Sequence, residues 1–149
     1  MIKTIDITAG ETKNLYQYLS AAVTPRPIAF VSTIDSKGNK NLSPFSFFNV
    51  FSINPPILVF SPVRRVRNNT SKHTLDNLYQ VKECVIALVT EEIVQQVSLS
   101  SCDFDAKINE FEKAGFTEVK SDLVEPARIK ESPINFECKI NDIINFART

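Results

Sequence analysis

The chain has 149 residues, of which 43% are hydrophobic and 23% charged, and its 17 basic residues balance its 17 acidic residues. This length and composition predict one folded domain over residues 1–149, and the zero net charge argues against a broad nucleic-acid-binding surface. No apolar run reaches the roughly 20 residues of a membrane-spanning helix, and the first residues lack the apolar core of a signal peptide. We therefore expect a cytoplasmic protein with no nucleic-acid or membrane partner.

Apolar runs alternate with turn residues along the whole chain, which predicts short strands and a few small helices. In chain order the predicted elements are a helix at 12–22, a strand at 26–34, a turn at 35–39, a strand at 56–61, a helix at 74–81, a strand at 84–90, a helix capped by Thr90, a helix at 105–114 and a strand at 134–140. Gly38 and Gly115 are placed to take a positive φ in a turn and after a helix. The pattern predicts a mainly β fold, a barrel with peripheral helices.

Residues 41–62 are rich in Phe, Ser and Pro and contain no charged residue. The prolines argue against a helix, and a strand that faces water usually alternates apolar with polar residues. This segment therefore needs contact with something other than water. The pattern leaves three covers open: the protein core, a second subunit, or a flat heteroaromatic ligand held by aromatic rings and Ser hydroxyls.

A basic cluster follows this segment, consisting of Arg64, Arg65, Arg67 and Lys72, and it ends at a possible helix N-terminus near Thr74. Cationic side chains and the N–H groups of a helix start both favour a phosphate, and a solvated loop has the same composition. A planar ring beside one phosphate is the outline of FMN.

Other chemistries lack the residues that they need. The three glycines cannot form a GxxxxGK[ST] or GxGxxG loop, the single His73 has no second His for a metal, and no GxSxG motif is present. Cys84, Cys102 and Cys138 show no CxxC spacing, so the sequence predicts neither a disulfide framework nor a zinc site. Cys84 and Cys138 lie in apolar runs, which predicts small core residues.

Five segments occur in a specific order from about Thr24 to Ile140: "TPRPIAFVSTID", "NLSPFSFFNVFSINPPILVFSPVRR", "SKHTLDNLYQ", "INEFEKAGFT" and "ESPINFECKI". In this order they closely resemble the flavin reductase-like, FMN-binding split-barrel family, which includes flavoredoxin-type proteins and reductase components of two-component monooxygenases. The resemblance implies a homodimer of split β-barrels with one FMN near each end of the shared interface. Relatives typically continue beyond the position of Thr149 with a further strand, so it also implies a C-terminally short chain.

The resemblance further implies a set of cofactor-binding residues and no catalytic or metal-binding side chain. The residues expected beside the flavin ring are Ser32, Thr33, Ser43, Pro44, Phe45, Ser46 and, as a further neighbour, Ser61. The residues expected at the phosphate are Arg65, Lys72 and Thr74. Arg26 lies on the strand that enters this site, and His73 stands where the family typically has Asp.

The implied activity is that of an NAD(P)H:flavin oxidoreductase, in which hydride passes to flavin N5 and the protein supplies position and electrostatics. The alternative is an FMN-holding electron carrier that acts with a protein redox partner, such as a monooxygenase, and has no NAD(P)H activity of its own. A protein that only dimerises through its Phe-rich surface is the third interpretation.

Overall fold

The computed structural model describes residues 4, 12–63, 71–102, 104 and 108–146. Its strands are β1 (Ala29–Ile34), β2 (Lys40–Phe45), β3 (Phe48–Ile53), β4 (Pro56–Phe60), β5 (Glu83–Leu88), β6 (Glu118–Val119), β7 (Arg128–Ile129) and β8 (Asn135–Lys139). Its helices are α1 (Thr12–Ala22), α2 (His73–Gln80), the 3₁₀ helix η1 (Glu91–Ile93), α3 (Val94–Ser100) and α4 (Glu110–Ala114). The described residues therefore form a mixed α/β fold, whereas the sequence predicted a mainly β fold with peripheral helices.

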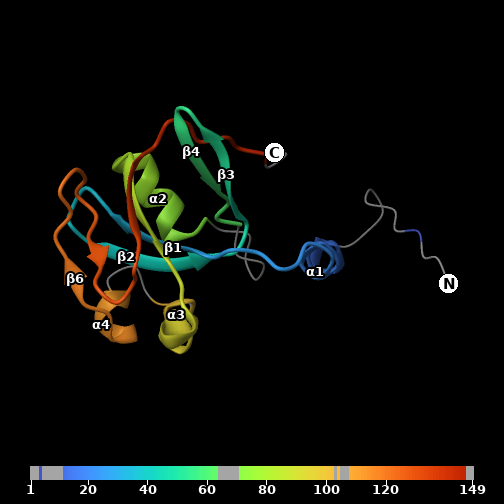
Figure 1. Ribbon diagram of the computed structural model, residues 1–149, viewed down its shortest axis with the longest axis horizontal. Coiled ribbons are helices and arrows are strands. Elements are labelled where there is room, and N and C mark those ends of the chain that lie inside the picture. Colours follow the sequence, from blue (N-terminus) through green and yellow to red (C-terminus); the bar gives the residue numbers. More distant parts are fainter. Residues whose placement is uncertain (1–3, 5–11, 64–70, 103, 105–107, 147–149) are drawn as a thin grey trace.

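A four-stranded antiparallel sheet with the order β2-β1-β5-β8 is the centre of the molecule (Figure 1). Strand β1 has the sequence AFVSTI, and every residue but the last is buried, because β2 and β5 pair with its two edges and other elements cover both faces. β-Branched and aromatic side chains suit such a strand. Side chains alternate across it, so Phe30 and Val31 enter two different cores.

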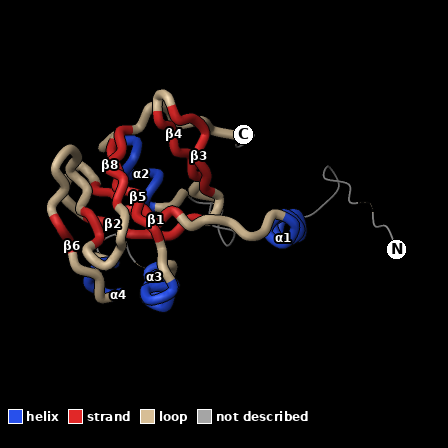
Figure 2. Tube along the Cα trace, viewed as in Figure 1, coloured by secondary structure: helices blue, strands red, loops and turns tan. Residues whose placement is uncertain are grey.

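Each face of the sheet is covered by its own layer. One face packs on α3 and α4 in a cluster that consists of Phe30, Leu42, Ala87, Ile93, Val97, Phe111, Ala114, Phe116 and Ile129. The opposite face packs on α2 and on the β3–β4 hairpin in a cluster that consists of Ala29, Val31, Phe45, Leu78, Cys84 and Ile86. Figure 2 shows the hairpin and α2 on the side of the sheet away from α3 and α4.

The β3–β4 hairpin forms a separate two-stranded sheet in the described residues. Phe48, Leu58 and Phe60 pack from it onto the second cluster, so side chains, and no ladder of hydrogen bonds, join it to the central sheet. The predicted barrel is consequently not closed in this structure. The chain leaves β2 at Phe45 and bends through residues 46–47 before β3 begins, and this bend interrupts the pairing.

Helix α1 stands out from the rest of the molecule at the end of an extended connection to β1 (Figure 1), and its Tyr16 ring lies 6.2 Å from the ring of Phe47. Its bounds agree with the prediction, but its apolar side chains Tyr16 and Leu19 are 44% and 59% exposed, and Val23, which follows the helix, is 58% exposed. The Arg26 guanidinium donates to the carbonyl oxygens of Ser20 and Val23, which fixes the end of the helix to the connection.

The four predicted strands are found to within a few residues as β1, β4, β5 and β8, whereas β2, β3, β6 and β7 were not among the predicted elements. Two helix starts also differ from the prediction. The capping position of α2 is Lys72, and Thr74 lies inside the first turn. The helix predicted at 105–114 begins at Glu110, because the Asn109 side chain accepts a hydrogen bond from the backbone N–H of Phe111 and so caps it. Residues 105–107 lie outside the described part of the chain. Gly115 ends α4 with φ 73°, as expected.

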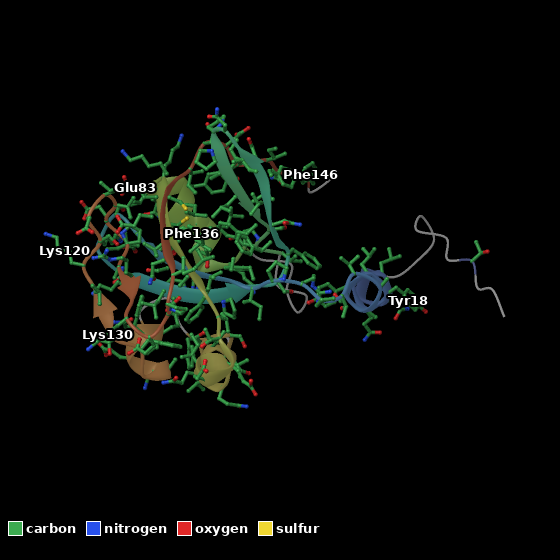
Figure 3. The ribbon with its side chains drawn as sticks, in the orientation of Figure 1. Tyr18, Glu83, Lys120, Lys130, Phe136 and Phe146 are labelled. Atoms are coloured by element: carbon green, nitrogen blue, oxygen red, sulfur yellow. The ribbon has the colours of Figure 1, made fainter. Side chains whose placement is uncertain are left out.

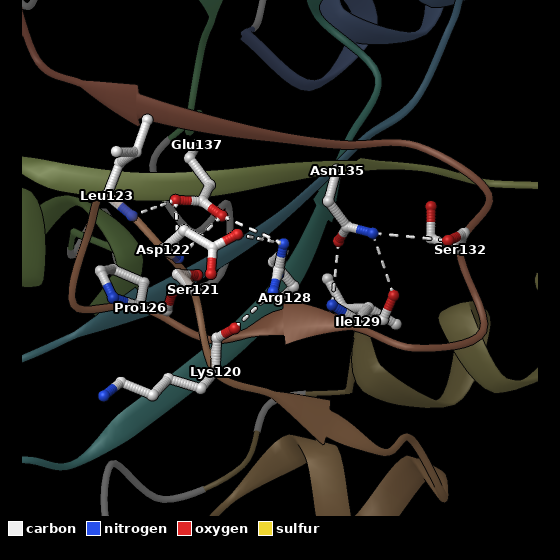
Figure 4. Close-up of polar contacts among 10 residues, drawn as sticks. All are labelled: Lys120, Ser121, Asp122, Leu123, Pro126, Arg128, Ile129, Ser132, Asn135 and Glu137. Carbon is white, nitrogen blue, oxygen red and sulfur yellow. Dashed lines mark hydrogen bonds and ion pairs between the residues drawn. The ribbon is translucent and has the colours of Figure 1, made fainter.

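A loop between β6 and β7 is held by side chains of β7 and β8 (Figure 4). The Glu137 carboxylate accepts hydrogen bonds from the backbone N–H groups of Asp122 and Leu123, and the Arg128 guanidinium pairs with Asp122 and Glu137 at 3.0 and 3.5 Å. This polar cluster fixes the β6–β7 loop to β8. Among the described helices, none has the length and apolar character needed to cross a membrane.

Candidate functional site

The uncharged segment 41–62 meets the start of α2 at Phe45. The Lys72 ammonium lies 5.0 Å from the centroid of the Phe45 ring. The centroid of the Phe60 ring, in β4, lies 5.5 Å from the centroid of the Phe45 ring. A cation placed so close to a ring face is attracted by its quadrupole. Phe45 is buried at 5% exposure, and Lys72 is half-buried. We call the surroundings of Phe45 and Lys72 the candidate site.

Beneath the candidate site, a buried polar network joins three elements. The Thr74 hydroxyl donates to Oδ1 of Asn41 at 2.7 Å, and Nδ2 of Asn41 donates to the Glu110 carboxylate at 2.9 Å. The other carboxylate oxygen accepts from the backbone N–H of Leu42 at 3.3 Å. Exposures are 0% for Thr74, 5% for Asn41 and 4% for Glu110. The network therefore fixes the first turn of α2 to β2 and to α4.

Ser32 and Thr33, predicted to line the flavin ring, are both buried at 1% exposure. They are consecutive in β1, so their side chains enter opposite faces of the sheet. The Thr33 hydroxyl accepts from Nδ2 of Asn77 in α2 at 3.1 Å. The structure therefore places Thr33 on the α2 side and Ser32 on the side of α3 and α4.

Ser43, Pro44 and Ser46, the remaining ring neighbours next to Phe45, are half-buried. The Ser46 hydroxyl accepts from Nε of Arg26 at 3.4 Å, and the same guanidinium lies 5.6 Å from the centroid of the Phe47 ring. Ser46 thus connects the candidate site with the residues that hold α1.

Ser61 is exposed, and its backbone N–H donates to the Phe47 carbonyl at 2.9 Å. It follows the last residue of β4, Phe60, and its hydrogen bond places it beside the bend at residues 46–47. Arg65, predicted at the phosphate, lies outside the described residues, as do Arg64 and Arg67 of the basic cluster.

The structure thus brings Phe45, Lys72 and Thr74 together at the start of α2, while it separates the side chains of Ser32 and Thr33. Sequence reasoning missed the polar residues Asn41, Asn77 and Glu110. Asn41 and Glu110 belong to two of the segments that carry the family resemblance, "NLSPFS" and "INEFEKAGFT". Their place in these segments was the one feature of the sequence that could have pointed to them.

The candidate site has a buried carboxyl group at one end and a cation at the other. Burial raises the pKa of the Glu110 carboxyl, against the opposing effect of hydrogen bonds from its own backbone, Asn41 and Leu42. Lys72 provides a positive charge at the other end, where the N-terminus of α2 adds the positive end of the helix dipole. Such a place suits an anion beside an aromatic surface. In the described residues no group of three or more His, Cys, Asp or Glu could hold a metal ion.

Comparison with known proteins shows the family and the fold of the chain. A 2-nitrobenzoate 2-nitroreductase from Pseudomonas fluorescens is 31% identical with a TM-score of 0.84, over 98% of this chain and 69% of that one. Component B of nitrilotriacetate monooxygenase from Bacillus cereus is 27% identical with a TM-score of 0.93, over 100% and 73% of the two chains. A nitroreductase and a monooxygenase component are both parts of redox systems, and both share this fold.

Residues 21–149 match the family described as flavin reductase like domain, and the chain belongs to this family. A protein of Aquifex aeolicus (strain VF5) is 44% identical over 133 residues, which are 89% of this chain and 66% of that protein. The chain thus spans slightly less than two thirds of the length of that curated relative.

The buried position of Glu110 predicts a pH dependence of stability. A carboxyl whose pKa is higher in the folded state stabilises the fold at low pH, and this contribution is lost as the pH rises past the ordinary value of 4.5 and through the raised pKa. Gln cannot ionise, and it keeps only one of the two acceptor oxygens, so Glu110→Gln should cost about 1–3 kcal/mol at low pH. The advantage of the native protein over this variant should shrink as the pH rises.

Urea unfolding across a pH series that spans 4.5 measures this difference. Glu112→Gln, an exposed change on the same helix, is the matched control and should not alter the pH profile. A constant difference between native protein and Glu110→Gln at all pH values would contradict the prediction.

Proposed function

We propose that this protein binds FMN at the candidate site and acts as an NAD(P)H:flavin oxidoreductase. The observation that carries the proposal is the position of Lys72, a cation over the Phe45 ring at the first turn of α2, in a chain that belongs to the flavin reductase-like family. FMN needs a cationic contact for its phosphate and an aromatic, uncharged surface for its ring. Bound FMN would supply the chemistry of accepting hydride at N5.

In this proposal the phosphate is held by Lys72 and by the start of α2. The Thr74 hydroxyl donates to Asn41 inside the protein, so Thr74 would contact a phosphate through its backbone N–H. Arg65 is proposed as a second cationic contact. The buried Asn41–Glu110 network would keep the first turn of α2 in place. A shift of this turn would leave buried polar atoms without hydrogen-bond partners, which costs free energy.

The ring side of the proposed site is formed by Ser43, Pro44, Phe45 and Ser46, with Ser61 at its margin. The half-buried Ser43 and Ser46 can offer hydroxyls and amides to the polar edge of the ring. Ser32 and Thr33 are buried, and they would support this wall by fixing β1 against β2 and α2. The exclusion of water around a charged flavin would strengthen these polar contacts.

The test of the proposed function is the visible spectrum of the purified full chain after addition of FMN and desalting, followed by NADH and then NADPH without oxygen. We expect a retained flavin band that at least one of the two donors bleaches. If neither donor bleaches it, the activity is that of an FMN-holding electron carrier, which needs a redox partner such as a monooxygenase component. If no band is retained and excess FMN does not support NAD(P)H oxidation, the proposal is wrong.

The role of Lys72 predicts that Lys72→Ala weakens FMN binding more than riboflavin binding, because only FMN carries the phosphate. A hydrogen bond to a charged group contributes about 1.5–3 kcal/mol, so the Kd for FMN should rise roughly tenfold to hundredfold. Fluorescence titration of both flavins measures the difference. Lys120→Ala, which removes an exposed lysine near β6, should leave both affinities unchanged (Figure 3). Equal losses for both flavins would remove Lys72 from the phosphate site.

We also propose that two copies of the chain form a homodimer through the outer face of β3 and α1. Val50, Phe51 and Ile53 of β3 are 58%, 75% and 87% exposed, and α1 adds further exposed apolar residues. Phe146 continues this surface close to the hairpin, at 87% exposure (Figure 3). Exposed apolar side chains in this number, on one strand and one helix, are typical of an interface.

The proposed dimer predicts that Ile53→Asp yields a monomer, because an unpaired carboxylate would be buried at the interface. The dimer Kd should rise by a factor of at least roughly 30, the effect of losing about 2 kcal/mol at a central contact. Sedimentation equilibrium measures it. Leu123→Asp changes a residue that is 76% exposed in the β6–β7 loop, and it should remain dimeric. A dimer of unchanged affinity in Ile53→Asp would refute this interface.

A further inference from the structure

Two cysteines that are distant in the sequence face each other across strands β5 and β8. Cys84 and Cys138 are direct partners in the antiparallel register. Hydrogen bonds from Ile140 to Lys82 and from Leu88 to Ile134 mark alternate pairs of this ladder, so Cys84 and Cys138 form a hydrogen-bonded pair as well. The Cα atoms of such a pair are about 5.5 Å apart, which is within the range of disulfides.

Both side chains lie on the same side of the sheet. Cys84 belongs to the cluster beneath α2 and the hairpin, and Cys138 packs against the same cluster. A hydrogen bond between the two thiols raises the pKa of Cys84, where burial adds to the effect, and lowers the pKa of Cys138. Cys84 is 1% exposed, whereas Cys138 is half-buried.

These differences give the two thiols different chemistry. The thiolate is the nucleophilic form of cysteine, so the thiol with the lower pKa and the greater access reacts first. That thiol is Cys138, and the buried Cys84 is adjacent to it as a second thiol. No third His, Cys, Asp or Glu joins them to form a metal site in the described part of the chain. The pair has the parts of a dithiol site and lacks those of a metal centre.

We propose that Cys84 and Cys138 are a redox-active dithiol that a hydroperoxide converts to a reversible disulfide. The Cys138 thiolate attacks the O–O bond, one oxygen stays on sulfur as a sulfenic acid, and the other leaves as water or an alcohol. Cys84 then attacks the sulfenic sulfur, forms the S–S bond and releases water. In sum, two thiols and one hydroperoxide give one disulfide, one water and one further water or alcohol.

The disulfide would join the last described strand of the sheet covalently to β5. Strand β8 is otherwise held by its ladder with β5 and by its contacts with the β6–β7 region. A thiol reductant would reverse the bond by thiol–disulfide exchange. This site does not depend on flavin binding, so it can be tested whether or not the proposed function is correct.

The test uses the full chain with Cys102→Ser, which removes the exposed third cysteine and leaves the pair. The native protein is treated with one equivalent of hydrogen peroxide, denatured, alkylated and mapped by mass spectrometry. We expect an intramolecular Cys84–Cys138 cross-link, the loss of both alkylation sites and of two hydrogens, and full recovery with dithiothreitol. Two alkylated cysteines, a link between two chains, or an oxidised Cys138 beside an alkylated Cys84 would each overturn the proposal.

Single variants in the same background separate the two thiols. In Cys84→Ala, Cys138 should still react and stop at a sulfenic acid that dimedone traps. In Cys138→Ala, Cys84 should react at least tenfold more slowly, because it is buried and has lost its partner. Equal reactivity of Cys84 with and without Cys138 would overturn the assigned order of attack. If either variant fails to fold by circular dichroism, the cross-link in Cys102→Ser still decides the proposal.

Discussion

The side chain of Asn41 is the contact on which the arrangement of the site depends. Its carbonyl oxygen accepts from Thr74 of α2, and its amide nitrogen donates to Glu110 of α4. The two helices lie on opposite faces of the central sheet, and Asn41 in the edge strand β2 joins them (Figure 1). A buried amide that lost either partner would leave a polar group without a hydrogen bond, so the network specifies one position for the first turn of α2.

Most of the fold could be predicted from local patterns. The alternation in "INFECKI" gave β8, the β-branched run in "RPIAFVSTI" gave β1, and Gly115 marked the end of α4. Strands β6 and β7 could not be found, because two residues carry no periodicity. The start of α4 was predicted too early, since it depends on the Asn109 side chain as a cap.

The candidate site could be predicted only in outline. The basic residue Lys72 and the aromatic residue Phe45 were both recognised as members of a binding surface, and the structure places them in contact. The partners below them could not be predicted, because Asn41 and Glu110 are 69 residues apart and no local rule connects them. For the same reason, the sequence could not show that the Thr74 hydroxyl is buried and donates to Asn41.

The side-chain attachment of the β3–β4 hairpin also bears on local motion. A two-stranded hairpin on its own is marginally stable in water, and this one is joined to the central sheet by the packing of Phe48, Leu58 and Phe60. It can therefore open without breaking any ladder bond of β1, so its free energy of opening should lie below that of the central sheet. Amide hydrogens of the hairpin would then exchange with solvent before those of β1. Because Phe60 contacts Phe45, each such opening would expose the aromatic wall beside Lys72.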